Sequence, residues 1–295
     1  MRAGIVATIL TAAVLLTTAA PVGAQQQAVS DPLLGQFGAI VEVAPPPPEA
    51  ARLANLFSTS LAALEPQRRR RLDVYLVVAS LWDDPVFERE AEQAEAILRE
   101  HLGAEGRSII LSAGGQGQRR YAAATPTNIS ATIGHVATLM DPAEDLLVLF
   151  ITSHGSADGA ASLRERNRLD ASLRPVSLSA MLSQANIHNR VVIVSSCFSG
   201  AFIPPIQDQN TIVLTAAAAD RTSFGCEPQR DWTYFGDAYF NRALRGGASM
   251  LEGFERAKAQ IATWETEQRL TPSMPQSAIG ANAAAMLQRA EREAR

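Results

Sequence analysis

The chain has 295 residues, of which 47% are hydrophobic and 19% are charged, and its formal net charge is −4. This composition is typical of a globular protein with one large domain, or with one domain and an appendage. A mildly acidic chain does not favour nucleic acid as a partner. The only dense basic run, at residues 68–71, is more typical of a solvated helix end than of a binding surface.

The amino terminus is typical of a secretory signal peptide. Met1 and Arg2 precede an apolar run from Ile5 to Ala20, and Val22-Gly23-Ala24 resembles a cleavage site. We expect residues 1–24 to be removed and the mature protein to be exported, either to the periplasm or out of the cell, without stable insertion in a membrane. An uncleaved anchor is the alternative, but the run is short for a spanning helix.

Two further segments precede the predicted main domain. Residues 25–48 are rich in Gln, Ala and Pro, which predicts an extended linker. Residues 49–72 form a predicted helical segment, because apolar residues recur at helical spacing over Glu49–Glu65. The remaining residues, 73–295, form the predicted main domain.

Helical and extended patterns alternate along this domain, which predicts a mostly parallel sheet covered by helices on both faces. The predicted strands are Asp73–Leu81, Arg107–Ser112, Asp145–Thr152, Arg190–Ser196 and Thr211–Ala216. The predicted helices are Asp84–Leu102, Thr127–Leu139 (capped by Thr127 or Asn128), Ser177–Gln184 (capped by Ser177), Asp231–Leu244, Ser249–Glu267 and Asn282 to the end. The predicted loops include the glycine-rich stretch Gly114–Gly117 and a long segment from Ser156 to Arg174.

Two strands of this set end in chemically reactive side chains. The run D-L-L-V-L-F-I-T-S-H-G leads to His154, and the run R-V-V-I-V-S-S-C-F-S-G leads to Cys197. Continuous apolar runs of this kind are typical of strands buried on both faces. The carboxyl ends of such strands are where open α/β sheets bind ligands. The pattern therefore predicts a cysteine nucleophile with a histidine base.

The predicted pair suits acyl transfer. A free thiol has a pKa of about 8.5 and attacks only as the thiolate, which a nearby imidazole favours. The same imidazole donates a proton to a leaving amine. Gly155 allows close backbone approach, so the N–H groups of Gly155 and Cys197 are the predicted oxyanion hole.

Other chemistries have weaker support in the sequence. Cys197 and Cys226 are the two cysteines, and a disulfide between them is the alternative expected of an exported protein. No His, Cys, Asp and Glu cluster has the spacing of a metal site, and we expect no cofactor. The glycine-rich loop lacks the lysine of a phosphate-binding loop, and no G-x-S-x-G of a serine hydrolase occurs.

Beyond these two strands, the sequence resembles the caspase-like cysteine peptidases, and most closely the legumain family (peptidase family C13) in its bacterial branch. The shared motifs are His154-Gly155, Cys197-Phe198-Ser199-Gly200, Thr215-Ala216-Ala217, Thr222-Ser223-Phe224-Gly225-Cys226 and Thr233-Tyr234-Phe235-Gly236-Asp237. The resemblance covers residues 74–280. It implies a caspase-like three-layer α/β/α sandwich, with Cys197 as nucleophile and His154 as general acid and base.

The resemblance also implies where the substrate binds. Asp237 matches an aspartate of the family's primary specificity pocket, and Ser195 stands where the family has an acidic residue. The family's pocket arginine has no unambiguous equivalent in residues 87–90, where Glu88 and Arg89 are the two candidates. The departure at Ser195 leaves the preferred residue before the scissile bond open.

The resemblance assigns a further role to Thr222 and Ser223, which match the segment on which the family lays its substrate as an added strand. No third residue that orients the catalytic histidine is visible in the sequence.

The function predicted is therefore that of an exported cysteine endopeptidase whose partner is a protein or peptide substrate. A transpeptidase that uses the same acyl-enzyme is one alternative. A non-enzymatic binding protein that keeps the fold is the other. The sequence predicts neither an oligomeric state nor a requirement for proteolytic activation.

Overall fold

A computed structural model of the chain describes residues 38–114 and 120–294. The predicted signal peptide, most of the predicted linker and most of the glycine-rich loop lie outside these residues. The strands are β1 (Val41–Glu42), β2 (Val74–Ser80), β3 (Ser108–Ser112), β4 (Ala122–Ala123), β5 (Leu146–Thr152), β6 (Ala161–Glu165), β7 (Leu169–Leu173), β8 (Arg190–Ser195), β9 (Thr211–Thr215) and β10 (Gln276–Ile279). The helices are α2 (Pro47–Ala62), α3 (Pro85–Leu102), α4 (Pro126–Leu139), α5 (Pro175–Gln184), the 3₁₀ helix η2 (Ser199–Phe202), α6 (Ile203–Ile206), α7 (Tyr234–Gly236), the π-helix η3 (Asp237–Leu244), α8 (Met250–Glu267) and α9 (Ala281–Glu293).

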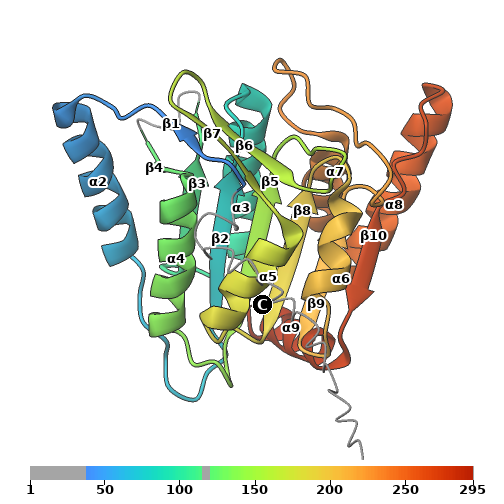
Figure 1. The fold of residues 1–295 in the computed structure, drawn as a ribbon. Coiled ribbons are helices and arrows are strands. Elements are labelled where there is room, and N and C mark those ends of the chain that lie inside the picture. The colour runs from blue at the N-terminus through green and yellow to red at the C-terminus, as the bar shows by residue number, and fades with distance from the viewer. Residues whose placement is uncertain (1–37, 115–119, 295) are drawn as a thin grey trace, which may run out of the picture. The chain divides into compact units, whose positions relative to one another are not determined.

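A seven-stranded sheet forms the middle of the domain, in the order β10-β9-β8-β5-β2-β3-β4. Its neighbouring strands are parallel except at one edge, where β10 runs antiparallel to β9 (Figure 1). All residues of β2, β5, β8 and β9 are buried. The sequence predicted these four strands, and the structure confirms the mostly parallel α/β architecture.

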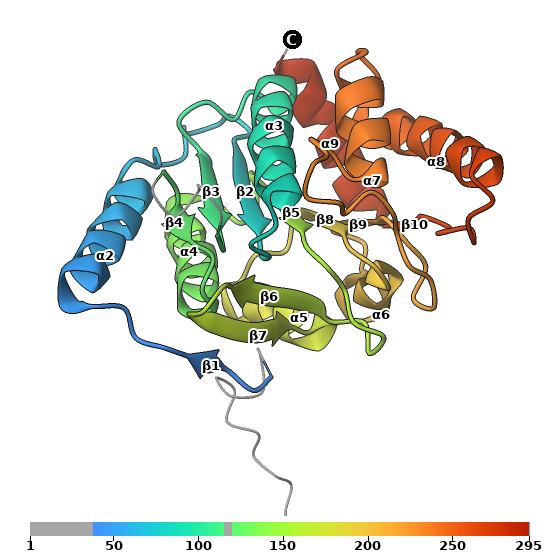
Figure 2. The same cartoon turned by 90° about the horizontal axis from the view of Figure 1, so that it is seen from above.

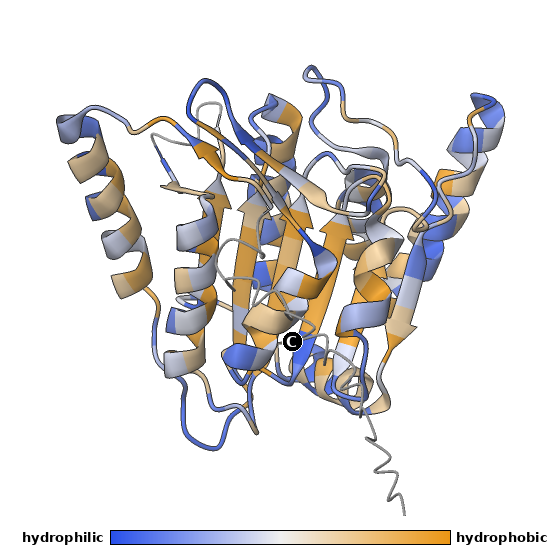
Figure 3. Cartoon of the chain, viewed as in Figure 1, coloured by the Kyte–Doolittle hydropathy of each residue, from blue (hydrophilic) through white to orange (hydrophobic). Residues whose placement is uncertain are grey.

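Helices cover both faces of this sheet (Figures 1 and 2). On one face, Val77 and Val192 belong to a core with residues of α4, α5 and α6. On the other face, Phe150 and Ile193 belong to a core with residues of α3, η3, α8 and α9. The central strands β2, β5, β8 and β9 are largely hydrophobic, and hydrophilic residues lie in the loops and on the helices (Figure 3). The domain is therefore a three-layer α/β/α sandwich.

A second, three-stranded sheet occupies the segment that the sequence analysis predicted as a long loop after His154. Strands β6 and β7 form a hairpin, and β1 pairs with β7 so that Val41 lies opposite Asp170. In β6 and β7 buried residues alternate with partly or fully exposed ones. The period-two pattern was missed because it is short and because a charged residue, Glu165, occupies one of the buried positions. Residues Val41 and Glu42 of the predicted linker thus form a β-strand that pairs with β7.

Several helix starts differ from the prediction, and three of them show how prolines and threonines set these positions. Helix α4 is capped by Thr125, whose side chain accepts from the N–H of Asn128 at 3.1 Å, and not by Thr127 or Asn128. Ser177 lies within α5, which begins at Pro175. Proline suits the first helical turn because its fixed φ fits there and its missing N–H is not needed.

The third difference concerns the helix predicted from Asp231. It begins instead with α7, where the Thr233 side chain caps the N–H of Gly236 at 3.0 Å. It continues as the π-helix η3, and π-helical turns occur often at functional sites. None of the described helices has both the length and the apolar composition needed to cross a membrane.

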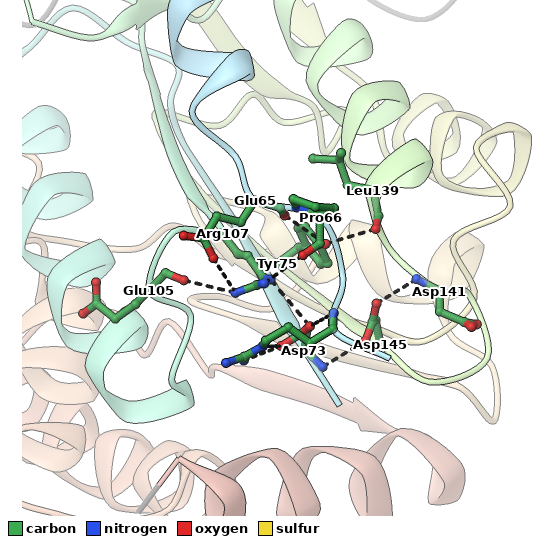
Figure 4. A network of polar contacts seen from close by, with 10 residues as sticks. Glu65, Pro66, Asp73, Tyr75, Glu105, Arg107, Leu139, Asp141 and Asp145 are labelled. Atoms are coloured by element: carbon green, nitrogen blue, oxygen red, sulfur yellow. Dashed lines mark hydrogen bonds and ion pairs between the residues drawn. The ribbon is translucent and has the colours of Figure 1, made fainter. Parts of the chain in front are cut away.

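A network of buried polar groups joins the amino-terminal ends of β2 and β5 (Figure 4). The Arg68 side chain binds the carboxylate of Asp73, whose backbone N–H donates to Asp145 at 2.9 Å. Burial raises the pKa of the Asp145 carboxyl group above its usual range. The guanidinium of Arg107 donates to the carbonyl oxygen of Pro66 at 2.8 Å and lies 3.6 Å from Asp73. Arg68, the first residue of the basic run, is therefore part of the fold.

We predict that Arg107→Ala lowers the free energy of unfolding by about 1 to 3 kcal/mol, because the carbonyl oxygen of Pro66 loses its donor while Asp73 keeps its contact with Arg68. Urea titration measures the change. Arg289→Ala is the matched control: its ion pair with Glu293 is exposed, so a loss below about 1 kcal/mol is expected. Equal small losses in the two variants would contradict the role of the network.

Candidate active site

The two predicted catalytic residues follow paired positions of neighbouring strands. Thr152, the last residue of β5, is in register with Ser195, the last residue of β8. The N–H of Ser153 donates to the carbonyl oxygen of Ser195 at 3.1 Å, so the strands remain in contact one residue beyond β5. His154 and Cys197 each stand two residues past this pair. The structure thus brings both to one edge of the sheet.

Gly155 lies directly against the backbone of Cys197. A Cβ atom at position 155 would overlap the carbonyl oxygen of Cys197, so the two loops approach as closely as they do only because residue 155 is glycine. The N–H groups of Gly155 and Cys197 donate no hydrogen bond to any residue in the part of the chain that the structure describes. Two unpaired N–H groups on touching segments suit an oxyanion hole.

The turn that carries Cys197 is fixed to the segment after β9. Phe198 has a φ of 58°, an unusual left-handed conformation for a bulky residue, and its N–H donates to the carbonyl oxygen of Arg221 at 2.7 Å. The N–H of Ser223 donates to the Cys197 sulfur at 3.3 Å. The predicted substrate-strand residue Ser223 therefore contacts the nucleophile, and Thr222 beside it is exposed.

Three residues that the sequence analysis missed surround the His154 imidazole. Its Nε2 atom lies 3.3 Å from Oδ2 of Asp84. The rings of Trp82 and Phe87 meet the imidazole edge to face, at centroid distances of 5.1 and 4.9 Å. The two aromatic rings and the carboxylate restrict the orientation of the imidazole. The His154 side chain is 35% exposed. Asp84 thus contacts the ring for which the sequence analysis found no partner.

A signal for these residues was present in the strand order. Strand β2 is parallel to β5, so the residues after Ser80 emerge beside the residues after Thr152. Asp84 stands at the N-cap of α3 but makes no capping hydrogen bond with its side chain. Its carboxylate turns to the histidine instead. A cap-type aspartate is common at helix starts, so residue type alone did not distinguish this role.

The residues predicted for the specificity pocket are engaged in different ways. The buried Ser195 hydroxyl lies 3.2 Å from the Thr233 hydroxyl. The Asp237 carboxylate accepts from the Asn241 amide at 2.6 Å and lies 3.3 Å from Nε of Arg242. Asp237 is therefore partly neutralised by its own helix, and the pocket role of both residues stays a prediction.

Glu88 and Arg89 point to different parts of the domain. The Ser112 hydroxyl at the end of β3 donates to Glu88 at 2.7 Å. The guanidinium of Arg89 donates to the carbonyl oxygen of Pro228 at 2.5 Å and forms an ion pair with Asp231 at 3.2 Å. Arg89 therefore holds the loop that precedes α7.

The two cysteines of the chain do not form a disulfide with each other. Cys197 and Cys226 are both free thiols. Burial raises the pKa of the Cys226 thiol far above its usual range, and the negative field of Cys197 acts in the same direction. Among residues 38–114 and 120–294, no three His, Cys, Asp or Glu side chains are grouped so as to hold a metal ion.

The fold and the site geometry define the class of protein. The three-layer sandwich is that of the caspases: the crystal structure of caspase-1 from Spodoptera frugiperda matches with a TM-score of 0.51 and 12% sequence identity, over 74% of this chain and 94% of that chain. No curated protein matches the sequence. The sequence model of the peptidase C13 family matches residues 114–285, which is more than half of the chain.

The chain belongs to the peptidase C13 family. Family membership and the caspase-like fold support cysteine peptidase activity and protein substrates.

We predict that Asp84→Ala lowers kcat/KM for a peptide substrate by roughly one to two orders of magnitude, because the imidazole loses its orienting carboxylate. Asp84→Asn should lose less, since its amide oxygen still accepts the hydrogen bond. Steady-state kinetics measure both. Asp220→Ala, which changes an exposed aspartate, is the control. Wild-type kinetics in Asp84→Ala would show that the contact with His154 has no catalytic role.

Proposed function

We propose that the protein is a cysteine endopeptidase that cleaves peptide bonds through Cys197 and His154, with a thioester acyl-enzyme as intermediate. The observation that carries the proposal is the contact of the two strand-end loops, where Gly155 lies against the Cys197 backbone. Membership of the C13 family supports the same chemistry.

In the first half of the reaction, the substrate acylates Cys197. The Cys197 thiolate attacks the scissile carbonyl carbon and forms a carbon–sulfur bond. The carbonyl oxygen becomes an oxyanion, which the N–H groups of Gly155 and Cys197 stabilise. When the carbon–nitrogen bond breaks, the His154 imidazolium donates its proton to the departing amine. The amino-terminal part of the substrate stays attached as a thioester.

The second half returns the enzyme to its starting state. His154, now neutral, accepts a proton from water as the water oxygen attacks the thioester carbonyl. The carbon–sulfur bond breaks, and the carboxylic product leaves. Asp84 holds the imidazole at Nε2 in both halves and stabilises its protonated form. Its role is to position the ring.

The substrate runs as an extended strand along Thr222 and Ser223, with the scissile bond over Cys197. The backbone of Ser223 already contacts the Cys197 sulfur, so a strand added at this edge has the nucleophile within reach. Ser195 and Asp237 line the pocket for the residue before the scissile bond. Since Arg242 accompanies Asp237, we do not expect a strong preference for basic side chains.

We predict that Cys197→Ala and His154→Ala each abolish peptide hydrolysis and leave the folded domain intact, because both side chains are partly exposed and lie outside the core. A library of fluorogenic peptides measures hydrolysis, and circular dichroism checks folding. Cys226→Ala is the matched control and should stay active. Undiminished hydrolysis by purified Cys197→Ala would refute the proposal.

The same assay separates the two alternatives. If an added amine is incorporated into the product in preference to water, the protein is a transpeptidase. If the wild-type protein hydrolyses no peptide and transfers none to an amine, it is a binding protein that keeps the fold.

A further inference from the structure

A buried carboxylate that has no part in the proposed chemistry lies beneath the catalytic residues. Glu90 belongs to the second turn of α3, and its side chain is completely buried. One of its oxygens accepts a hydrogen bond from the Thr152 hydroxyl. The other accepts from the Thr233 hydroxyl at 2.6 Å. Burying a carboxylate is costly, and these two hydrogen bonds offset only part of the cost.

The hydrogen bonds of this group run in a defined direction. The Thr233 oxygen accepts from the N–H of Gly236 at 3.0 Å and lies 3.2 Å from the Ser195 oxygen. A hydroxyl group has one proton, and that of Thr233 is given to Glu90. Ser195 is therefore the donor in its contact with Thr233. The chain of donors runs from Ser195 to Thr233 to Glu90, and Thr152 donates to Glu90 from the other side.

The donors at the two ends of this network are the paired last residues of the catalytic strands. Thr152 ends β5 two residues before His154, and Ser195 ends β8 two residues before Cys197. One carboxylate thus connects the two strand ends that carry the reacting groups. It also contacts the last residue of α7, since a Cβ atom at position 236 would overlap a Glu90 oxygen.

We propose that Glu90 is a positioning residue that holds Thr152 and Ser195, and through them His154 and Cys197, in their reactive arrangement only when its carboxylate is ionised. The proposal rests on the proposed peptidase function. An ionised carboxylate accepts both hydrogen bonds. A protonated one has to donate its own proton to Thr152 or Thr233, so one arm of the network reverses. If the protonated Glu90 donates to Thr233, the Thr233 hydroxyl is free to donate to Ser195. The Ser195 hydroxyl then changes from hydrogen-bond donor to acceptor.

This change falls in the neutral range. Burial raises the pKa of Glu90 to about 7, against the opposing effect of the hydrogen bonds from Thr152 and Thr233. The elements around Glu90 present mainly uncharged groups to it. Strand β5 presents the Thr152 hydroxyl, α7 presents the Gly236 N–H, and the loop before α7 carries the thiol of Cys226. Cys226 stays neutral at pH 7 because burial raises the pKa of its thiol. Asp237, next to Gly236, is held by Asn241 and Arg242.

The test is the ratio of wild-type to Glu90→Gln kcat, measured with one peptide from about pH 5 to about pH 9. The amide mimics the neutral acid in shape and charge. We expect a ratio near one at acidic pH that rises to roughly tenfold or more, with a midpoint near pH 7, because the two proteins differ only at position 90 and every pH dependence that they share cancels in the ratio. KM should change less than kcat. A ratio that is constant across the pH range would overturn the proposal.

Two further variants keep the test decisive. Thr152→Val removes one arm and should give the same pH-dependent loss, even if Glu90→Gln does not fold. Glu291→Gln changes a buried carboxylate that accepts from the N–H of Met250 at 2.6 Å and from His101, away from the site, and its ratio should be flat. A pH-dependent ratio in Glu291→Gln would show that any buried glutamate produces the effect, and this too would overturn the proposal.

The failure of this inference differs from the failure of the peptidase function. If the wild-type protein is active and Glu90→Gln matches it at every pH, only the role of Glu90 is wrong. If the wild-type protein hydrolyses nothing, the peptidase function is wrong. The role of Glu90 is then tested by the rate at which iodoacetamide alkylates Cys197, because alkylation needs no peptide substrate. The ratio of the wild-type rate to the Glu90→Gln rate is expected to show the same dependence on pH.

Discussion

The register between β5 and β8 is the constraint on which the candidate active site depends. A strand with one apolar face fixes its register by alternation, because a slip of one residue exposes the apolar face. Strands β5 and β8 are buried on both faces, so alternation fixes little. The polar residues at their two ends supply what the apolar pattern does not. At one end the side-chain amide of Asn189, just before β8, donates to the carbonyl oxygen of Pro142, before β5; at the other end Thr152 and Ser195 are linked through Thr233 and Glu90.

The two edges of the sheet use their polar residues differently. At the amino-terminal edge, Arg68, Arg107, Asp73 and Asp145 bind one another and nearby backbone, and the network joins β2 to β5. At the carboxyl-terminal edge, side chains of small size and unpaired N–H groups leave room for a reacting group. The aromatic rings of Trp82 and Phe87 and the close approach of Gly155 fix that edge without filling it. Stability and chemistry are thus assigned to opposite ends of the same strands.

The sequence was sufficient for features that depend on one segment at a time. The central strands were predictable because an apolar run of β-branched residues has few alternatives, and the placement of His154 and Cys197 at one edge of the sheet followed from the ends of two such runs. Features that depend on two segments were not predictable. The hairpin β6–β7 buries one face only through contact with the core, and β1 is a strand only because β7 is beside it. Asp84 and Glu90 acquire their roles from neighbours that lie far away in sequence.

The central claim is that Cys197, in the arrangement described, is the nucleophile of an acyl-transfer reaction. The most direct measurement is mass spectrometry of the protein after inhibition by a peptidyl acyloxymethyl ketone, which alkylates a catalytic thiolate. The account predicts one adduct per chain, located on Cys197, with activity lost in proportion to labelling and Cys226 left unmodified because its buried thiol stays protonated. Peptide hydrolysis that persists after Cys197 is fully modified would contradict the account.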